Sequence, residues 1–156
     1  MKTIAKKLGI LLSKRGKTLS TAESCTGGLI AKTITDIPGS SRYFAGGVVS
    51  YSNEIKSKVL RVGRVLLEKH GAVSEEAALA MAKGVQALMH TDCAIAVTGI
   101  AGPDGGSAKK PVGLVYIAVA NGKDIEVKRY VFHKDREGNR KETTAAAINM
   151  LLQKLQ

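Results

Sequence analysis

Segments with helical periodicity alternate with short apolar segments along most of this chain, and no other feature limits its possible fold as strongly. Within residues 3–15, Ile4, Leu8 and Leu12 recur at the spacing of one helix face. The alternation stops at Asn121-Gly122, a strong hairpin signal between two strand-like segments. Such an order predicts an α/β domain built in layers, with a mostly parallel sheet and one antiparallel strand.

Glycine, proline and capping residues set the expected bounds of these elements. Ser52 or Asn53 is expected to cap one helix and Ser74 another, while Gly71 fits a left-handed C-terminal cap. The expected strands cover 18–22, 46–51, 93–98, 112–120 and 124–132, and the expected helices cover 3–15, 26–34, 53–60, 64–69, 75–89 and 138–155.

The composition is that of one globular domain covering 1–156. Hydrophobic residues make up 44% of the 156 residues and charged residues 24%, which excludes a disordered chain. No apolar stretch approaches the ~20 residues of a membrane span, and no signal-peptide cleavage site follows the basic start. Two cysteines, Cys25 and Cys93, are too few for a disulfide framework. We therefore expect a reducing, cytoplasmic setting.

The charge balance is strongly basic. Twenty-four basic residues against 13 acidic ones give a net charge of +11, which suggests nucleic-acid binding. However, the first basic residues are spread along one amphipathic helix, and aromatic residues make up only 4% of the chain, with no Trp. A base-stacking platform is therefore disfavoured. We favour the lysine-rich surface of an enzyme, then attraction of a small anionic substrate, and nucleic acid last.

Three loops that follow predicted strands carry most of the reactive side chains: 22–28, 50–56 and 98–106. In α/β sheets of this kind, ligands bind beyond the carboxyl ends of the strands. Since all three loops are expected at those ends, the sequence predicts one site where they converge.

The segment TAESCTGG, residues 21–28, places Ser24 and Cys25 at a predicted strand-to-helix turn. A nucleophile there lies close to the helix dipole and to free backbone N–H groups that stabilise an oxyanion. Gly27 and Gly28 let a substrate approach the backbone. Two other interpretations stay open at this point. Ser24 or Thr26 simply caps the helix, or Cys25 is the nucleophile.

The segment YSNEIK, residues 51–56, places Tyr51 at a strand end and Lys56 one turn into the next helix. A lysine with a lowered pKa can act as the base for a serine, and a tyrosine can relay a proton. The alternative is a packing tyrosine and a solvated lysine. Ser107 and Lys110 also match the S-x-x-K pattern of serine/lysine enzymes, but they lie in a Gly/Lys-rich loop. We attribute that match to chance.

The glycine-rich segment GIAGPDGG, residues 99–106, fits either a loop that wraps a substrate or an ordinary surface turn, with Asp104 as a ligand or a turn-former. Arg136 and Arg140 are spaced i, i+4 and can hold a phosphate from one helix face, or they lie at an exposed helix start. The three histidines are scattered without metal-ligand spacing. We therefore predict no metal site and no cofactor.

Four long segments together resemble the CinA C-terminal family. They are TAESCTGGLIAKTITDIPGSSRYFAGGVVSYSNEIKSKVL, HGAVSE, AIAVTGIAGPDGG and KPVGLVYIAVA, and they agree in order and spacing over residues 3–154. The resemblance implies a three-layer α/β/α sandwich of the anticodon-binding-domain-like type, with a mixed, mostly parallel five-stranded sheet. It also implies a homodimer or a higher homo-oligomer. Many members carry a further N-terminal domain, and this chain looks like the stand-alone form.

The resemblance also implies an activity. The family is known for hydrolysing nicotinamide mononucleotide to nicotinate mononucleotide and ammonia, with a serine nucleophile assisted by a lysine and a tyrosine. On this chain these residues are Ser24, Lys56 and Tyr51. Backbone N–H groups in 25–28 or 99–102 are expected to hold the oxyanion, and an arginine the phosphate. The expected substrate contacts are Cys25, Thr26, Gly27, Gly28, Thr98, Gly99, Ala101, Gly102, Arg136 and Arg140.

The chain departs from the family pattern near the last helix. The usual F-x-G-D-R reads FHKDR here, with Lys134 in place of the glycine. Gly138-Asn139 is expected to weaken the helix start, and Gly63 stands where a helix-starting proline is expected. These departures leave Ser24 and Lys56 untouched and bear instead on the arginine contacts.

Three other functions remain alternatives to the amidase. The first is a non-catalytic regulatory or nucleotide-binding module linked to competence or DNA damage. The second is a nucleic-acid binder, for which binding would depend steeply on salt. The third is an amidase for another small amide.

Overall fold

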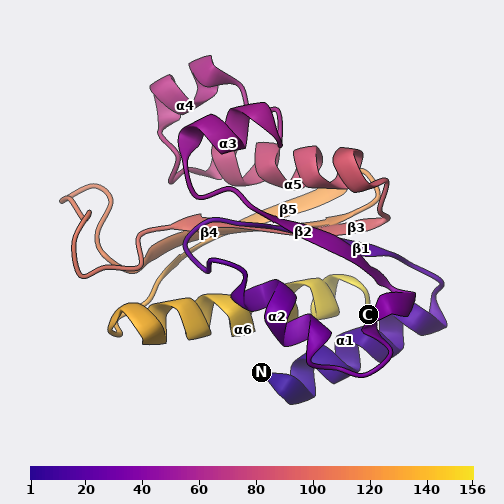
Figure 1. The fold of residues 1–156 in the computed structure, drawn as a ribbon. Helices are drawn as coiled ribbons and strands as arrows, with labels where there is room; N and C mark the ends of the chain where they lie inside the picture. The colour runs from indigo at the N-terminus through magenta and orange to yellow at the C-terminus, as the bar shows by residue number, and fades with distance from the viewer.

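A five-stranded sheet lies between two layers of helices in the computed structural model, which describes residues 1–156 (Figure 1). The strand order is β2-β1-β3-β4-β5. The strands are β1 Leu19–Glu23, β2 Phe44–Val49, β3 Cys93–Gly99, β4 Leu114–Asn121 and β5 Asp124–Val131. The helices are α1 Lys2–Lys14, α2 Leu29–Thr35, α3 Asn53–Lys58, α4 Arg64–His70, α5 Glu75–Met89 and α6 Arg136–Lys154, with a 3₁₀ turn at Ser40–Arg42.

The sheet is mixed, with one reversed strand. Strand β1 pairs in parallel with β2 and with β3, whereas β4 runs antiparallel to both β3 and β5. Four strands therefore point the same way and β4 alone runs against them. The predicted mostly parallel sheet with one antiparallel strand is confirmed, and so is the three-layer architecture.

The two faces of the sheet pack against different kinds of helices. Helices α1, α2 and α6 cover one face, and α5 covers the other, with α3 and α4 beside it (Figure 1). On β3, Ile95 and Val97 belong to the core under α6, whereas Ala94 and Ala96 belong to the core under α5. Burial on both faces explains why β3 reads as a continuous apolar run.

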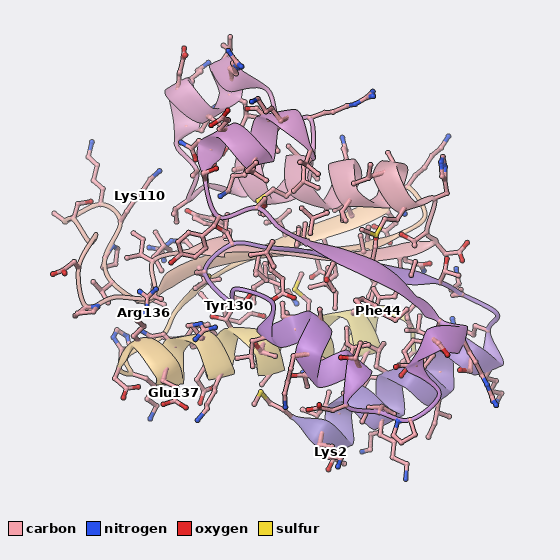
Figure 2. All side chains as sticks on the ribbon, in the orientation of Figure 1. Lys2, Phe44, Lys110, Tyr130, Arg136 and Glu137 are labelled. Carbon is pink, nitrogen blue, oxygen red and sulfur yellow. The ribbon has the colours of Figure 1, made fainter.

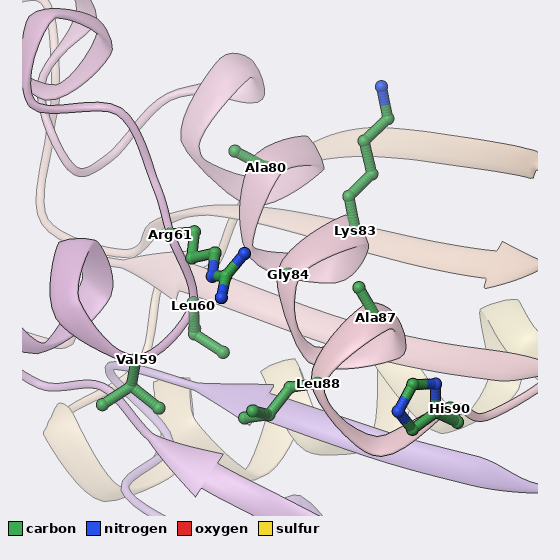
Figure 3. Close-up of a pocket in the computed structure, with 9 residues that line it drawn as sticks. All are labelled: Val59, Leu60, Arg61, Ala80, Lys83, Gly84, Ala87, Leu88 and His90. Carbon is green, nitrogen blue, oxygen red and sulfur yellow. The ribbon is translucent and has the colours of Figure 1, made fainter.

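The segment between α3 and α4 packs closely on α5 at Gly84. A Cβ atom on Gly84 would overlap the carbonyl oxygen of Leu60. Figure 3 shows this contact region, where Leu60 and Arg61 lie beside the face of α5 that carries Gly84, Ala87 and Leu88. The glycine thus permits the close approach that holds α3, and with it Lys56, above the sheet.

Several predicted bounds shift in the structure. The helix expected over 26–34 begins at Leu29, because Gly27 and Gly28 have φ angles of +58° and +96°. The strand expected over 46–51 covers Phe44–Val49, and that expected over 112–120 covers Leu114–Asn121. The hairpin turn is Gly122-Lys123, since Asn121 still pairs with Asp124.

The capping predictions have mixed outcomes. Ser52 accepts a hydrogen bond from the backbone N–H of Ile55, and Ser74 accepts one from that of Ala77, so both caps are confirmed. The predicted left-handed cap at Gly71 is wrong, because its φ of 77° is combined with ψ of 167° and the backbone leaves the helix in a different conformation.

The last helix begins two residues earlier than expected. Asp135 caps α6 by accepting a hydrogen bond from the backbone N–H of Gly138 at 2.7 Å. A Cβ atom on Gly138 would lie 2.6 Å from Cβ of Lys134. Glycine is thus the residue that fits against Lys134 in this turn, and α6 forms from Arg136 onward with Gly138-Asn139 inside it.

Candidate active site

The carboxyl ends of β1, β2 and β3 meet at one edge of the sheet, and α6 begins at the same edge. Glu23 is the last residue of β1 and lies between Val49 of β2 and Val97 of β3 in the strand register. The three loops with most of the reactive side chains, 22–28, 50–56 and 98–106, therefore leave the sheet side by side. The structure brings them together as the sequence order predicts.

Ser24 and Lys56 lie in direct contact at this edge. Lys56 Nζ donates a hydrogen bond to Ser24 Oγ at 2.9 Å and another to the carbonyl oxygen of Ser50 at 2.7 Å. Lys56 comes from α3, which Ser52 caps, and the carbonyl oxygen of Tyr51 lies 3.5 Å from the same ammonium. A serine hydroxyl and a lysine amine are thus placed at the distance that proton transfer requires.

Lys56 is enclosed by the protein, with 1% of its surface exposed. Burial lowers the pKa of its side chain below the ordinary lysine value of 10.5, and no carboxylate forms an ion pair with it to oppose that shift. A buried lysine with a lowered pKa reaches its neutral, basic form more easily than a solvated one. The alternative of a solvated Lys56 is wrong.

Tyr51 lies at the outer rim of this edge. Its side chain is 62% exposed, so the alternative of a packing tyrosine is also wrong. Its hydroxyl oxygen accepts a hydrogen bond from Arg136 at 3.0 Å, and the same guanidinium donates to the carbonyl oxygen of Gly102 at 2.7 Å. Figure 2 labels Arg136 where α6 begins, beside the loop that carries Lys110. Arg136 therefore ties the tyrosine to the glycine-rich loop.

Arg140 lies one turn further along α6 and contacts the Ser24 loop. Its Nε donates to the carbonyl oxygen of Cys25 at 3.2 Å, and one terminal nitrogen donates to that of Thr26 at 2.8 Å. A Cβ atom on Gly27 would lie 3.4 Å from the same guanidinium, in a backbone of positive φ. The start of α6 around Arg136 is exposed, as the alternative expected, but both arginines donate hydrogen bonds to the neighbouring loops.

Cys25 does not have the properties of a nucleophile. It is 6% exposed and belongs to the apolar core under α6. Burial raises the pKa of its thiol to about 11, so that the thiolate is scarce at neutral pH. Of the two neighbouring candidates, Ser24 alone contacts a base.

The glycine-rich loop contributes mainly backbone atoms. The carbonyl oxygen of Ala101 accepts a hydrogen bond from the side chain of Asn139, and Gly99 packs against the carbonyl oxygen of Leu114 so closely that a Cβ atom would lie 2.7 Å from it. Thr98 is turned elsewhere, since its hydroxyl donates to the carbonyl oxygen of Ala72 at 2.7 Å. Thr98 therefore holds the segment before α5 in place of facing Ser24.

Two buried polar residues at this edge, Glu23 and Asn139, were not among the residues predicted from the sequence. Glu23 is 1% exposed, and its carboxylate accepts hydrogen bonds from the Thr26 hydroxyl and from three backbone N–H groups at the start of α2. Asn139 is also 1% exposed and joins the Ala101 carbonyl oxygen to the backbone N–H of Lys134. A single acid at the end of a predicted strand, just before a helix, is a signal that could have indicated Glu23.

A hollow of about 770 Å³ opens beside these residues. It lies between the first turn of α6 and the glycine-rich loop. Arg140 connects its wall with the Ser24 loop, and Arg136 connects it with Tyr51. Three of the residues around it are basic, and two are acidic. The lining residues are Ala101, Gly102, Pro103, Val112, Lys134, Asp135, Arg136, Glu137 and Arg140.

No group of three or more His, Cys, Asp or Glu side chains is placed to hold a metal ion. No helix is both long enough and apolar enough to pass through a bilayer.

Comparisons with known proteins agree with this architecture. The chain is 54% identical over 153 residues to a CinA-like protein of Geotalea uraniireducens, covering 98% of this chain and 36% of that protein. It thus spans about a third of the length of the curated relatives it matches. The crystal structure of the competence/damage inducible protein CihA from Agrobacterium tumefaciens superposes with a TM-score of 0.97 at 41% identity, covering 99% of this chain and 95% of that one.

A second solved structure gives the same result. Competence damage-inducible protein A from Klebsiella pneumoniae matches with a TM-score of 0.96 at 37% identity, over 99% of this chain and 96% of that one. The family model described as the CinA C-terminal domain matches residues 1–155. With nearly every residue covered, this chain belongs to the CinA C-terminal domain family.

Proposed function

We propose that this protein hydrolyses the carboxamide of nicotinamide mononucleotide, giving nicotinate mononucleotide and ammonia. The observation that carries the proposal is the 2.9 Å contact between Ser24 Oγ and the buried amine of Lys56. A serine hydroxyl is a weak nucleophile until a base accepts its proton. The substrate itself comes from the family resemblance.

The proposed reaction has two halves. Ser24 Oγ attacks the carboxamide carbon while neutral Lys56 accepts the hydroxyl proton, and the tetrahedral oxyanion forms. The C–N bond then breaks as ammonia leaves with a proton that Tyr51 helps to deliver, so that an acyl-enzyme on Ser24 remains. Water adds to that ester, and the carboxylate departs as Ser24 regains its proton. The side-chain nucleophile makes a metal ion unnecessary in this scheme.

The positive charge beside the site supports an anionic substrate. The net charge of the chain is +11, and the hollow next to Arg136 and Arg140 also has Lys134 in its wall. We propose that the 5′-phosphate binds there, where a guanidinium can offer paired donors. Removal of the phosphate from the substrate should therefore raise KM. A homodimer or higher homo-oligomer belongs to the same proposal.

The decisive experiment measures ammonia release from nicotinamide mononucleotide in EDTA by the purified protein and by Ser24→Ala. We expect steady release by the wild type and a loss on the order of 10⁴-fold or more in the variant, since the nucleophile is removed. Near-normal turnover by Ser24→Ala would refute the serine mechanism.

One alternative has support from the comparisons, because similar proteins carry names that refer to competence and damage. A regulatory or nucleotide-binding module would bind the nucleotide without turnover. Binding without ammonia release by the wild type would favour that alternative over the amidase.

A further inference from the structure

Two consecutive backbone N–H groups beside Ser24 lack an oxygen acceptor within the protein. The N–H groups of Cys25 and Thr26 lie between β1 and α2, and neither donates to any oxygen of the protein. Thr26 is fully buried, and Cys25 is 6% exposed. Buried backbone donors without a partner are rare, because their desolvation costs about as much as a lost hydrogen bond.

The other N–H groups of the same turn are all occupied. The N–H of Ser24 donates to the carbonyl oxygen of Val97 at 3.1 Å, and that of Gly27 donates to the carbonyl oxygen of Ser24 at 3.0 Å. The N–H of Gly28 donates to the Glu23 carboxylate at 3.0 Å. The turn therefore leaves only the two donors that follow the nucleophile directly.

Glu23 holds the end of this turn that leads into α2. Its Oε2 accepts hydrogen bonds from the Thr26 hydroxyl at 2.6 Å and from the N–H groups of Gly28 and Ile30 at 3.0 Å each, and Oε1 accepts one from Ala31 at 2.8 Å. The carboxylate thus occupies the donors at the start of α2. An oxyanion therefore cannot bind the N–H groups at the start of α2, but it can bind those of Cys25 and Thr26.

Arg140 holds the part of the turn that directly follows Ser24. It holds the carbonyl oxygen of Cys25 at 3.2 Å and that of Thr26 at 2.8 Å. In a trans peptide the N–H points opposite to the C=O of the same unit. The contact at the Cys25 carbonyl oxygen therefore turns the N–H of Thr26 away from Arg140. The turn is held between a carboxylate and a guanidinium that bind different atoms of it.

We propose that Glu23 is a positioning residue for catalysis, which holds the turn so that the N–H groups of Cys25 and Thr26 form the oxyanion hole of Ser24. This inference rests on the proposed function, and it adds the residue that builds the site. Preorganised backbone donors of this kind stabilise the tetrahedral intermediate without reorganising during the reaction.

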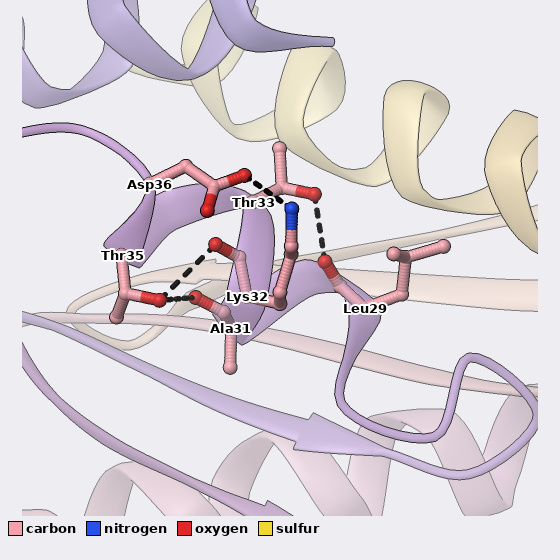
Figure 4. A network of polar contacts seen from close by, with 6 residues as sticks. All are labelled: Leu29, Ala31, Lys32, Thr33, Thr35 and Asp36. Carbon is pink, nitrogen blue, oxygen red and sulfur yellow. Dashed lines mark hydrogen bonds and ion pairs between the residues drawn. The ribbon is translucent and has the colours of Figure 1, made fainter.

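The test compares Glu23→Gln, Thr26→Val and Thr33→Val. Thr33 is the matched control: it is a buried threonine whose hydroxyl donates at 2.7 Å to the carbonyl oxygen of Leu29 within α2, away from the turn (Figure 4). We expect kcat to fall about 10²-fold in Glu23→Gln and about tenfold in Thr26→Val, with KM within threefold of wild type, because the oxyanion is not present in the ground state. Thr33→Val should keep kcat within twofold, per folded molecule.

Two outcomes would overturn the inference. The first is a kcat of Glu23→Gln close to wild type per folded molecule. The second is an equal fall of kcat in Thr26→Val and Thr33→Val, which would mean that the hydroxyls only stabilise α2. If Glu23→Gln does not fold, the threonine pair decides the question alone.

The rate of covalent labelling of Ser24 tests the role of Glu23 independently of the proposed substrate. A fluorophosphonate reacts with an activated serine as the P–F bond breaks: fluoride leaves, the hydroxyl proton goes to the base, and the phosphoryl oxygen of the tetrahedral adduct takes the oxyanion position. Its rate of reaction with Ser24 should fall in the variants by the same order as kcat. If the wild type is labelled but does not hydrolyse nicotinamide mononucleotide, the substrate is wrong and the labelling rates judge Glu23. If the wild type is not labelled, the inference falls together with the serine nucleophile.

Discussion

Two serine–lysine pairs in this molecule behave in opposite ways. Ser107 and Lys110 are three residues apart in the sequence, yet Lys110 Nζ donates to the carbonyl oxygen of His70, and the Ser107 hydroxyl accepts from the backbone N–H of Lys110. Ser24 and Lys56 are separated by 32 positions, and their side chains are in contact. A sequence pattern thus does not indicate which pair can transfer a proton, whereas burial and the strand order do.

Burial is the physical difference between the two pairs. Ser107 is exposed and Lys110 is half-buried, so water can solvate the charged ammonium. Lys56 is 1% exposed and has only neutral oxygens as partners. Removal of water disfavours the charged form of an amine, and the fold therefore supplies the base that the pattern alone cannot.

The largest expected difference between the pairs is in Lys56→Met against Lys110→Met. Methionine has a similar length but no amine, so we expect kcat for amide hydrolysis to fall on the order of 10⁴-fold in the first variant and to stay within twofold in the second. Thermal unfolding of both variants provides the control for folding. Equal kcat values in Lys56→Met and Lys110→Met would mean that the buried contact has no part in catalysis.

The pH dependence of kcat/KM should show a smaller effect than the replacement of Lys56, and its direction follows from the burial of that lysine. Burial places the folded pKa of Lys56 below 10.5, and only neutral Lys56 accepts a proton. We therefore expect kcat/KM to rise about tenfold per pH unit below that pKa and to level off above it. A rising limb whose apparent pKa is 10.5 or higher, with chemistry limiting the rate, would contradict the role of a buried Lys56.

The same shift has a consequence for stability. Between the folded pKa of Lys56 and 10.5, the unfolded chain binds more protons than the folded one, so the unfolding free energy of the wild type rises with pH in that window. Lys56→Met lacks this contribution. The melting temperature of Lys56→Met relative to that of the wild type should therefore be highest at neutral pH and should decrease as pH rises toward 10.5.

The comparison also explains what the sequence could and could not predict. The mostly parallel sheet with one antiparallel strand and the convergence of the three loops follow from periodicity and from the hairpin at Asn121, because these signals are local. The role of Asn139 does not, since the carbonyl oxygen that it binds, on Ala101, is brought near by the fold. Nor does sequence spacing reveal that Arg140 binds the carbonyl oxygens of the Ser24 loop, 114 and 115 positions away.

The smallest expected effect concerns Cys25, which shares a turn with Ser24. Burial lowers the pKa of Lys56 and raises that of the Cys25 thiol to about 11, and in both cases the neutral form gains. A neutral amine is a base, but a neutral thiol is a poor nucleophile. The same buried environment therefore makes the lysine a better base and the cysteine less reactive. Cys25→Ala should therefore keep kcat within threefold, and iodoacetamide at pH 8 should leave the activity of the wild type intact. Rapid inactivation by iodoacetamide that Cys25→Ala abolishes would show that the thiol is reached from solvent as a thiolate. In that case, the contrast between the two side chains would not come from burial.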